Sequence, residues 1–405
     1  MINKLQTKKV AIFGYGKTTK ALAKHLTNAT FYDDKCEKEQ QDAEGNSIKP
    51  STAFESEAYE FAVTSPGIPP SNMLIQKAKN LLSEYDLFAD TEPLKIWISG
   101  TNGKTTTTQM MTHLLAEKGA LAGGNIGTPL GELDVNAAIW ILETSSFTMH
   151  YTTEAKPNIY VLLPLSPDHL SWHGSMEAYE ADKLKPLSMM QEDDIAIIPK
   201  KYANTPTKAK IITYKDEQSL AKEFGIDMQK VKFKGAFLLD ALLAMAVEKL
   251  LFNKVDYEKI NSFTLDPHRQ EELHDSQGRL WVNDTKATNL DATIAAVKRY
   301  QDSFIHLILG GDDKGVELHE LFAFLAPLQL KIYAIGSNKE RLVALAQEYN
   351  IAYVKCANLL NAVEMIDSAL KKDEVALLSP AAASLDEFDS YAHRGNDFKS
   401  AVMLK

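Results

Sequence analysis

Short apolar runs rich in Val, Ile and Phe alternate with helical patterns along the whole chain. This alternation is typical of parallel β-sheets whose strands are joined by crossover helices, so we predict an α/β protein. The pattern starts afresh near residues 93 and 267, which predicts three domains spanning residues 1–92, 93–266 and 267–405. Each of these lengths is usual for a domain.

Every predicted domain has its own series of strands. In the first, strands at 9–13, 29–32 and 60–64 with a helix at 18–27 predict a small Rossmann-like unit. The second has predicted strands at 95–99, 137–143, 158–163, 194–199 and 209–214 and helices at 104–118, 176–190 and 236–251. In the third, strands at 280–283, 304–309, 332–335, 352–354 and 375–378 predict a doubly wound, Rossmann-like domain.

Composition narrows the class of protein. Of the 405 residues, 45% are hydrophobic, and no apolar run approaches the ~20 residues of a membrane span. The polar start of the chain lacks a secretory signal pattern, and Cys36 and Cys356 lie outside any metal-ligand spacing. A formal net charge of -10 gives no overall attraction for nucleic acid. We therefore expect a cytoplasmic protein with no membrane span and no nucleic-acid partner. We further take it to be a monomer that acts on small-molecule substrates.

The strongest local motif is Gly100-Thr101-Asn102-Gly103-Lys104-Thr105-Thr106, between a predicted strand and a predicted helix. Backbone N–H groups of such a loop can wrap a phosphate chain at the helix N-terminus, while Lys104 neutralises phosphate charge and Thr105 ligates Mg²⁺. The full Walker spacing would need glycine in place of Ile98, so this is a compressed P-loop. It predicts that the central domain binds ATP.

The form Gly-Thr-x-Gly-Lys-Thr resembles the loop of the Mur ligases and the related folylpolyglutamate synthetases. Further motifs extend the resemblance along nearly the whole chain: Asn125-Ile126-Gly127-Thr128-Pro129, Glu143-Thr144-Ser145-Ser146-Phe147, Asp168-His169-Leu170, His173-Gly174-Ser175, Lys183 and Pro267-His268-Arg269. The resemblance implies a Rossmann-like N-terminal domain for the UDP-substrate, a central P-loop ATPase-type domain and a C-terminal domain for the amino acid.

The resemblance also implies roles for single residues. The magnesium ligands would be Thr105, Glu143, His169 and Lys183, with Lys183 carbamylated by CO₂, because a lysine ammonium would repel the metal. The catalytic residues would be Lys104, His169, Lys183 and Arg269. ATP would be bound by Gly100, Thr101, Asn102, Gly103, Lys104, Thr105, Thr106, Arg269 and Asp284.

One segment narrows the choice within the family. Asn283-Asp284-Thr285-Lys286-Ala287-Thr288-Asn289 resembles the branch that adds D-glutamate to UDP-N-acetylmuramoyl-L-alanine, and the segments 310–314, 378–386 and 394–396 agree with it. The resemblance then assigns the UDP-muramoyl substrate to Gly16, Lys17, Thr18, Asp33, Asp34, Ser65, Gly67 and Asn125. It assigns D-glutamate to Lys286, Thr288, Lys314, Ser384 and Tyr391.

The resemblance implies a ligase of peptidoglycan precursor synthesis that activates a carboxylate with ATP as an acyl phosphate. Three alternatives stay open: another Mur-type or folylpolyglutamate-synthetase-like ligase, a nucleotide-dependent oxidoreductase, and a non-enzymatic P-loop regulator. The oxidoreductase would use the loop that begins Gly14-Tyr15-Gly16, but Thr19 stands where a dinucleotide loop has its third glycine. Phe237 and Asp240 also depart from the family's nucleotide-positioning asparagines, so we expect stacking or backbone contacts to hold the base.

Overall fold

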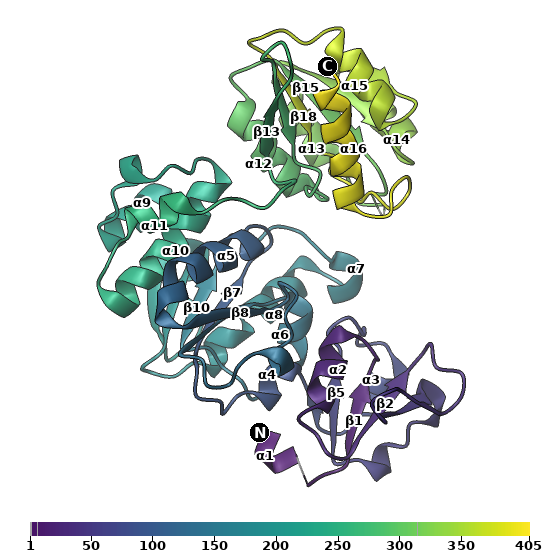
Figure 1. Cartoon of the computed structure of the whole chain (residues 1–405), viewed down its shortest axis with the longest axis vertical. Helices are drawn as coiled ribbons and strands as arrows, with labels where there is room; N and C mark the ends of the chain where they lie inside the picture. The colour runs from purple at the N-terminus through teal and green to yellow at the C-terminus, as the bar shows by residue number, and fades with distance from the viewer. Residues whose placement is uncertain (1, 6, 314) are drawn as a thin grey trace. The chain divides into compact units, whose positions relative to one another are not determined.

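The structure is a computed structural model that describes residues 2–5, 7–313 and 315–405 (Figure 1). Within those residues the strands form three six-stranded sheets, in the order of the three predicted domains. The chain divides into two compact units, Met1–Phe233 with Phe237–Phe263, and Lys234–Ala236 with Thr264–Lys405. The three sheets confirm the predicted fold class. The residue boundaries predicted for three domains stay a prediction.

The first sheet has the strand order β3-β4-β2-β1-β5-β6, with every pairing parallel except that of β3 with β4. Its strands are β1 (Val10–Phe13), β2 (Ala29–Asp33), β3 (Gln40–Gln41), β4 (Ser47–Pro50), β5 (Phe61–Thr64) and β6 (Leu81–Leu82). Its helices are α1 (Ile2–Leu5), α2 (Lys17–Ala23), α3 (Met73–Lys77) and α4 (Glu84–Leu87). Helix α2 ends earlier than predicted because the chain turns at His25, whose ring lies 2.8 Å from Gly131 O.

The second sheet is parallel throughout, in the order β12-β11-β10-β7-β9-β8. Its strands are β7 (Leu94–Ser99), β8 (Ala120–Gly124), β9 (Ile139–Glu143), β10 (Ile159–Leu162), β11 (Ile195–Pro199) and β12 (Lys210–Tyr214). The helices are α5 (Lys104–Leu115), α6 (Ser146–Tyr151), α7 (Leu170–His173), α8 (Met176–Met189), α9 (Glu217–Phe224), α10 (Ala236–Phe252) and α11 (Tyr257–Ser262). Sequence analysis missed β8 because its Ala-Leu-Ala-Gly-Gly sequence has none of the β-branched residues that favour strands.

The third sheet has the order β13-β14-β18-β15-β16-β17, and only β13 runs antiparallel to its neighbour. Its strands are β13 (Glu271–His274), β14 (Leu280–Asn283), β15 (Ile305–Gly310), β16 (Leu330–Ile335), β17 (Ala352–Lys355) and β18 (Val375–Leu378). Its helices are α12 (Leu290–Tyr300), α13 (His319–Leu325), α14 (Lys339–Glu348), α15 (Leu359–Asp367) and α16 (Tyr391–Met403). Because β18 lies between β14 and β15, the strand order reverses there, which is where open α/β sheets bind ligands.

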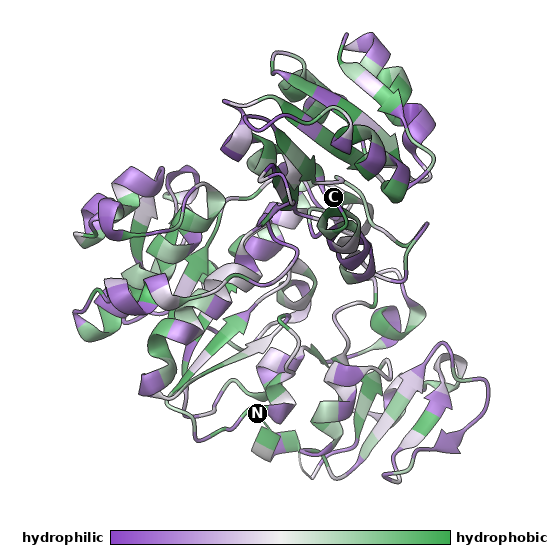
Figure 2. Ribbon diagram, turned by 45° about the horizontal axis from the view of Figure 1, so that its top comes forward, coloured by the Kyte–Doolittle hydropathy of each residue, from purple (hydrophilic) through white to green (hydrophobic). Residues whose placement is uncertain are grey.

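Hydrophobic residues are frequent in the strands, whereas most helices alternate hydrophobic and hydrophilic residues (Figure 2). Strands β10 and β15 are buried at every position, as expected for central parallel strands with both faces covered. Helix α10 is buried from Asp240 to Glu248 and is apolar on nearly all sides. No helix in the described part of the chain is long and apolar enough to cross a membrane.

Candidate active site

The predicted P-loop connects β7 to α5. Gly100 and Gly103 have φ angles of +147° and +83°, which side-chain-bearing residues rarely adopt. A Cβ on Gly103 would lie 2.4 Å from Asp240 Oδ1, and one on Gly100 would lie 2.6 Å from Leu163 Cβ. The loop therefore packs tightly against the sheet and α10, and it leads into the N-terminus of α5, whose N–H groups favour anions.

Thr101 fixes the middle of this loop. Its buried Oγ1 donates to Ser166 O at 3.1 Å, accepts from Ser166 N at 3.0 Å and lies 2.9 Å from Tyr179 Oη. Lys104 Nζ donates to Thr101 O at 2.7 Å, so its ammonium group lies over the loop. This geometry suits a cation that neutralises phosphate oxygens held by the loop.

Lys183 lies inside the protein although α8 carries it near the middle of a polar sequence. Its exposed fraction is 2%, and Nζ lies 3.4 Å from Ser99 Oγ, at the end of β7. Burial lowers the pKa of Lys183 well below its ordinary value, and the positive charge of Lys104 lowers it further, against the opposing effect of carboxylates that include Asp168 and Glu143. The site therefore favours the neutral amine, the form that reacts with CO₂.

Glu143 ends β9 and is 2% exposed. Its Oε1 accepts from Asn125 Nδ2 at 2.7 Å, whereas its buried Oε2 has no hydrogen-bond partner among the described residues. The main-chain oxygen of Glu143 accepts from Asn125 N at 2.9 Å and from Tyr85 Oη at 3.0 Å. An oriented, unpaired carboxylate oxygen fits the hard cation that the sequence predicts here, because Mg²⁺ prefers oxygen ligands.

His169 has a left-handed backbone, with a φ of +53°, and its side chain is half exposed. Its ring lies 4.7 Å from the ring of Phe147, and Nε2 lies 3.4 Å from Asp168 Oδ2. Within the described residues, no three His, Cys, Asp or Glu side chains form a group that could hold a metal ion. The case for a metal at this site therefore rests on the unpaired Glu143 oxygen, and the assignment of His169 stays a prediction.

The loops of the first sheet meet at its carboxyl edge. Tyr15 N donates to Asp33 Oδ2 at 2.7 Å, and a Cβ on Gly14 would lie 3.2 Å from Ser65 Cβ. Lys17 Nζ donates to Gly127 O, which joins this edge to the segment that contains Asn125. Of the residues predicted for the UDP-substrate, this edge includes Gly16, Lys17, Thr18, Asp33, Asp34, Ser65 and Gly67.

Thr19 explains why the first loop departs from a dinucleotide loop. Its Oγ1 donates to Gly14 O at 2.8 Å and accepts from Gly16 N at 3.0 Å. The hydroxyl thus uses the backbone N–H of Gly16 to close the loop on itself. This internal bond weakens the oxidoreductase alternative, in which such N–H groups would face a pyrophosphate.

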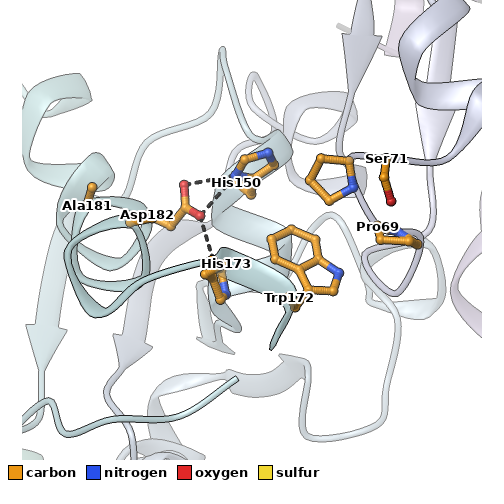
Figure 3. Close-up of a pocket in the computed structure, with 10 residues that line it drawn as sticks. Pro69, Ser71, His150, Trp172, His173, Ala181 and Asp182 are labelled. Atoms are coloured by element: carbon orange, nitrogen blue, oxygen red, sulfur yellow. Dashed lines mark hydrogen bonds and ion pairs between the residues drawn. The ribbon is translucent and has the colours of Figure 1, made fainter. Parts of the chain in front are cut away.

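Sequence analysis missed a cluster around Asp182, the residue before Lys183. Asp182 Oδ2 lies 2.9 Å from His150 Nδ1 and 3.0 Å from His173 Nδ1 (Figure 3). His173 Nε2 lies 2.9 Å from Ser146 Oγ. Burial lowers the pKa of His173 against the influence of Asp182. The cluster ties α8 to α6 and α7, and it could not be predicted because its members are distant in sequence.

A pocket of about 710 Å³ opens beside this cluster (Figure 3). His150, Trp172, His173 and Asp182 line one side of it, and the segment 69–71 of the first sheet's edge lines another. The pocket belongs to the same compact unit as the P-loop.

Residues predicted for D-glutamate lie at the carboxyl edge of the third sheet, in the second unit. Lys286 Nζ lies 5.4 Å from the centre of the Tyr391 ring, Thr288 is exposed, and Ser384 is buried. Lys314 lies outside the described residues.

Asp284 and Arg269, which were predicted to bind nucleotide, are also in the second unit. Burial raises the pKa of Asp284 to about 7, although Ser379 Oγ donates to its Oδ2 at 2.8 Å and Arg269 lowers its pKa. The buried Nε of Arg269 has no hydrogen-bond partner among the described residues.

The positions where the family has base-binding asparagines are occupied differently in the first unit. Phe237 is buried, and Asp240 Oδ1 accepts from Thr107 Oγ1 at 3.0 Å. Neither side chain is therefore open to replace such an asparagine.

The chain is similar in sequence to known proteins along nearly its whole length. Residues 98–244 match the Mur ligase middle domain. The chain is 55% identical over 398 residues to a UDP-N-acetylmuramoylalanine–D-glutamate ligase of Campylobacter jejuni, covering 97% of this chain and 99% of that protein. A protein of the same name from Helicobacter pylori is 45% identical over 419 residues, covering 98% of this chain and 99% of that protein. The chain belongs to the Mur ligase family.

Solved structures resemble this Mur ligase in fold. MurF ligase from Thermotoga maritima in complex with ADP superposes with a TM-score of 0.61 at 16% identity, covering 99% of this chain and 96% of that one. UDP-N-acetylmuramate-alanine ligase MurC from the same organism has a TM-score of 0.54 at 14% identity, covering 97% and 98%. These similarities confirm the three-domain Mur ligase fold predicted from the motifs.

Proposed function

We propose that this Mur ligase uses ATP to add D-glutamate to UDP-N-acetylmuramoyl-L-alanine during peptidoglycan precursor synthesis. The observation that carries the proposal is the identity of 55% across 97% of the chain with a ligase of that name. The segment Lys286-Ala287-Thr288-Asn289, which resembles the D-glutamate-adding branch, supports the same substrate. The predicted cytoplasmic location and monomeric state belong to this proposal.

The substrate carboxylate and the γ-phosphate are both anions, so cations must lie where they meet. Two unit charges 4 Å apart repel by about 4 kcal/mol at an effective dielectric constant of 20. Lys104 over the P-loop and the N–H groups at the start of α5 provide positive charge for the phosphates. For Arg269, whose buried Nε has no hydrogen-bond partner among the described residues, we keep the nucleotide-binding role that the resemblance implies.

The metal ligands in this proposal are Thr105, Glu143, His169 and carbamylated Lys183. Bound Mg²⁺ would supply charge neutralisation at the phosphate and carboxylate oxygens. Asn125 orients Glu143 by donating to Oε1, which directs the other oxygen away from that hydrogen bond. Because the pKa of Lys183 is lowered, its amine is neutral and can react with CO₂. The resulting carbamate would replace a cation with an anionic oxygen ligand.

The reaction has two steps. The carboxylate of UDP-N-acetylmuramoyl-L-alanine attacks the γ-phosphorus, and ADP leaves with the electrons of the broken P–O bond. The amine of D-glutamate then attacks the acyl phosphate, and phosphate leaves as the amide bond forms. The Thr288 and Ser384 hydroxyls with the Lys286 and Lys314 ammonium groups are assigned to the two carboxylates of D-glutamate.

Phosphate release from ATP tests this function. The purified protein is given Mg²⁺, ATP and UDP-N-acetylmuramoyl-L-alanine with D-glutamate, L-glutamate, L-lysine or diaminopimelate, and the product is identified by mass spectrometry. We expect product only with D-glutamate. Product with another amino acid would indicate a different ligase of this family. Nucleotide binding without phosphate release under any condition would instead favour a regulator.

A further inference from the structure

Arg394, in the first turn of α16, is 1% exposed, and within the described residues its guanidinium donates hydrogen bonds only to uncharged oxygens. Its Nε donates to Thr285 Oγ1 at 2.8 Å, and Nη2 donates to Thr285 O at 3.0 Å and Ala382 O at 3.1 Å. Its Nη1 donates to Gly310 O at 3.3 Å and Ala383 O at 3.4 Å. One planar guanidinium thus joins three segments that are distant in sequence.

These three segments follow the carboxyl ends of β14, β15 and β18, where the strand order of the sheet reverses. The segment after β14 carries Thr288 and the segment after β18 carries Ser384, both assigned to D-glutamate above. Arg394 contacts each segment at its base rather than at these side chains. Its hydrogen bonds therefore set the spacing between the loops that would hold the amino acid.

The glycine in the loop after β15 makes room for this arrangement. Gly311 has a φ of +144°, and a Cβ there would lie 2.1 Å from Ala383 O and 3.1 Å from Arg394 Nη1. A side chain at this position would push the guanidinium and the β18 segment away. The buried arginine can therefore pack here only because residue 311 has no side chain.

The charge of Arg394 is not neutralised by a close partner. No carboxylate of the described residues lies within ion-pair distance of its guanidinium. Burial lowers the pKa of Arg394 to about 10, against the raising effect of Asp386 and Glu387, so the group stays protonated at neutral pH. A buried cation with no carboxylate in direct contact is costly even though Asp386 and Glu387 act on it from a distance, and an incoming anion would relieve part of that cost.

We propose that Arg394 is a positioning residue for the incoming amino acid, holding the three loops in register and keeping a positive charge beneath a dicarboxylate substrate. This inference rests on the proposed function, because D-glutamate is the dicarboxylate in question. Arg394 itself does not contact the reacting atoms. Its effect reaches the substrate through the loops and through its electric field.

The test compares Michaelis constants in Arg394→Met and Arg394→Lys. We expect Arg394→Met to raise the KM for D-glutamate about tenfold or more, and the KM for ATP and the UDP-substrate less than about twofold. Arg394→Lys keeps the charge but cannot bind all three segments, so we expect an intermediate KM for D-glutamate. Equal changes in all three constants, or an unchanged KM for D-glutamate, would overturn the inference.

Arg279 provides a matched control within the same unit. It is also buried, at 5% exposed, but its guanidinium pairs with Asp275, which follows β13, and with Asp367, which ends α15. Arg279→Met should lower stability without a selective change in the KM for D-glutamate. The same selective change in both variants would mean that destabilisation of the domain, rather than Arg394, causes it.

A second variant and the wild-type enzyme are measured as well. If Arg394→Met does not fold, Thr285→Val removes the acceptor of the 2.8 Å bond with little change in volume, and a selective rise in the D-glutamate KM is again expected. Wild-type protein is assayed alongside. No D-glutamate-dependent turnover in the wild type would refute the proposed function and this inference together, whereas normal wild-type turnover with unchanged variants would refute the inference alone.

Discussion

The Lys183 Nζ atom lies 3.4 Å from Ser99 Oγ, so the lysine of α8 reaches the last residue of β7, directly before the P-loop. The P-loop cation Lys104 is close enough to lower the pKa of Lys183, after burial as the main cause. A second ammonium group beside the partly buried Lys104 is unfavourable when it is itself buried. The structure therefore favours one charged lysine over the phosphate loop and one neutral lysine behind it.

Replacing Lys183 with Met should lower kcat at least ~100-fold while the protein stays folded, because the proposed metal ligand is lost and the buried site accepts an apolar chain. Thermal unfolding should occur at or above the wild-type temperature. Lys183→Arg should not restore activity, since arginine keeps a positive charge and cannot form a carbamate.

Carbamylation itself is measured with ¹³C-labelled bicarbonate and carbon NMR. The wild type should give one carbamate signal that disappears in Lys183→Met, and its intensity should rise with pH because protonation competes with the reaction. An active wild-type enzyme with no such signal after CO₂ depletion and replenishment would contradict this role for Lys183.

Lys104→Ala should lower turnover about 100- to 1,000-fold, because a preorganised cation at the developing phosphate charge is lost. The melting temperature should change little, since Lys104 is only partly buried and its bond is to Thr101 O. Lys118, exposed beyond the other end of α5, is the matched control, and Lys118→Ala should keep full activity. Near-normal turnover in folded Lys104→Ala would remove the P-loop assignment.

Periodicity was enough to predict most of the fold. The apolar runs that became β10, β15 and β18 are buried on both faces, so their sequences identify them without knowledge of their neighbours. The strands β3, β4, β6, β8 and β13 were not predicted. For two of them the cause is local: β8 is rich in glycine, and β13 alternates exposed and half-buried residues at a sheet edge. Neither pattern differs enough from a loop.

The local backbone of the candidate site was predictable where the motif is one continuous segment. The P-loop is such a segment, and its glycines have the backbone angles that the motif requires. Contacts between segments were not predictable: Ser99 beside Lys183, Asp182 between two histidines, and Arg394 among three loops depend on tertiary packing. The sequence shows Arg394 only as part of the 394–396 motif. The structure shows which backbone and hydroxyl oxygens accept hydrogen bonds from its guanidinium.

Glu143→Gln should raise the Mg²⁺ concentration needed for half-maximal activity about tenfold or more, because an amide is a weaker ligand for a hard cation than a carboxylate. The fold should survive, since Gln keeps an oxygen that can accept from Asn125 Nδ2. Thermal stabilisation by Mg²⁺ with ATP should shrink in parallel. Glu177 is an exposed carboxylate at the start of α8, and Glu177→Gln should leave the Mg²⁺ dependence unchanged.

A different carboxylate should control the pH dependence of stability. Glu84, in α4, is 6% exposed, and its Oε2 accepts from Leu130 N at 3.3 Å. Burial raises its pKa from 4.5 to about 8. Since Tyr85 in the same helix donates to Glu143 O, this helix supports the end of β9 as well as the contact with Leu130.

The direction in which stability changes with pH follows from proton binding by Glu84. Between pH 4.5 and about 8, folded protein keeps a proton on Glu84 that unfolded protein has released, so the free energy of unfolding falls as pH rises. Each unit of pKa shift corresponds to about 1.4 kcal/mol. Glu84→Gln is uncharged throughout and should therefore be more stable than wild type at pH 8.5, with a smaller advantage at pH 5.5. Urea unfolding at both pH values measures this difference.

The exposed Glu132, on the neighbouring turn after Leu130, serves as control. Glu132→Gln should change the free energy of unfolding equally at the two pH values. A Glu84→Gln advantage that is the same at pH 5.5 and 8.5 would show that this carboxyl does not hold its proton in the folded enzyme.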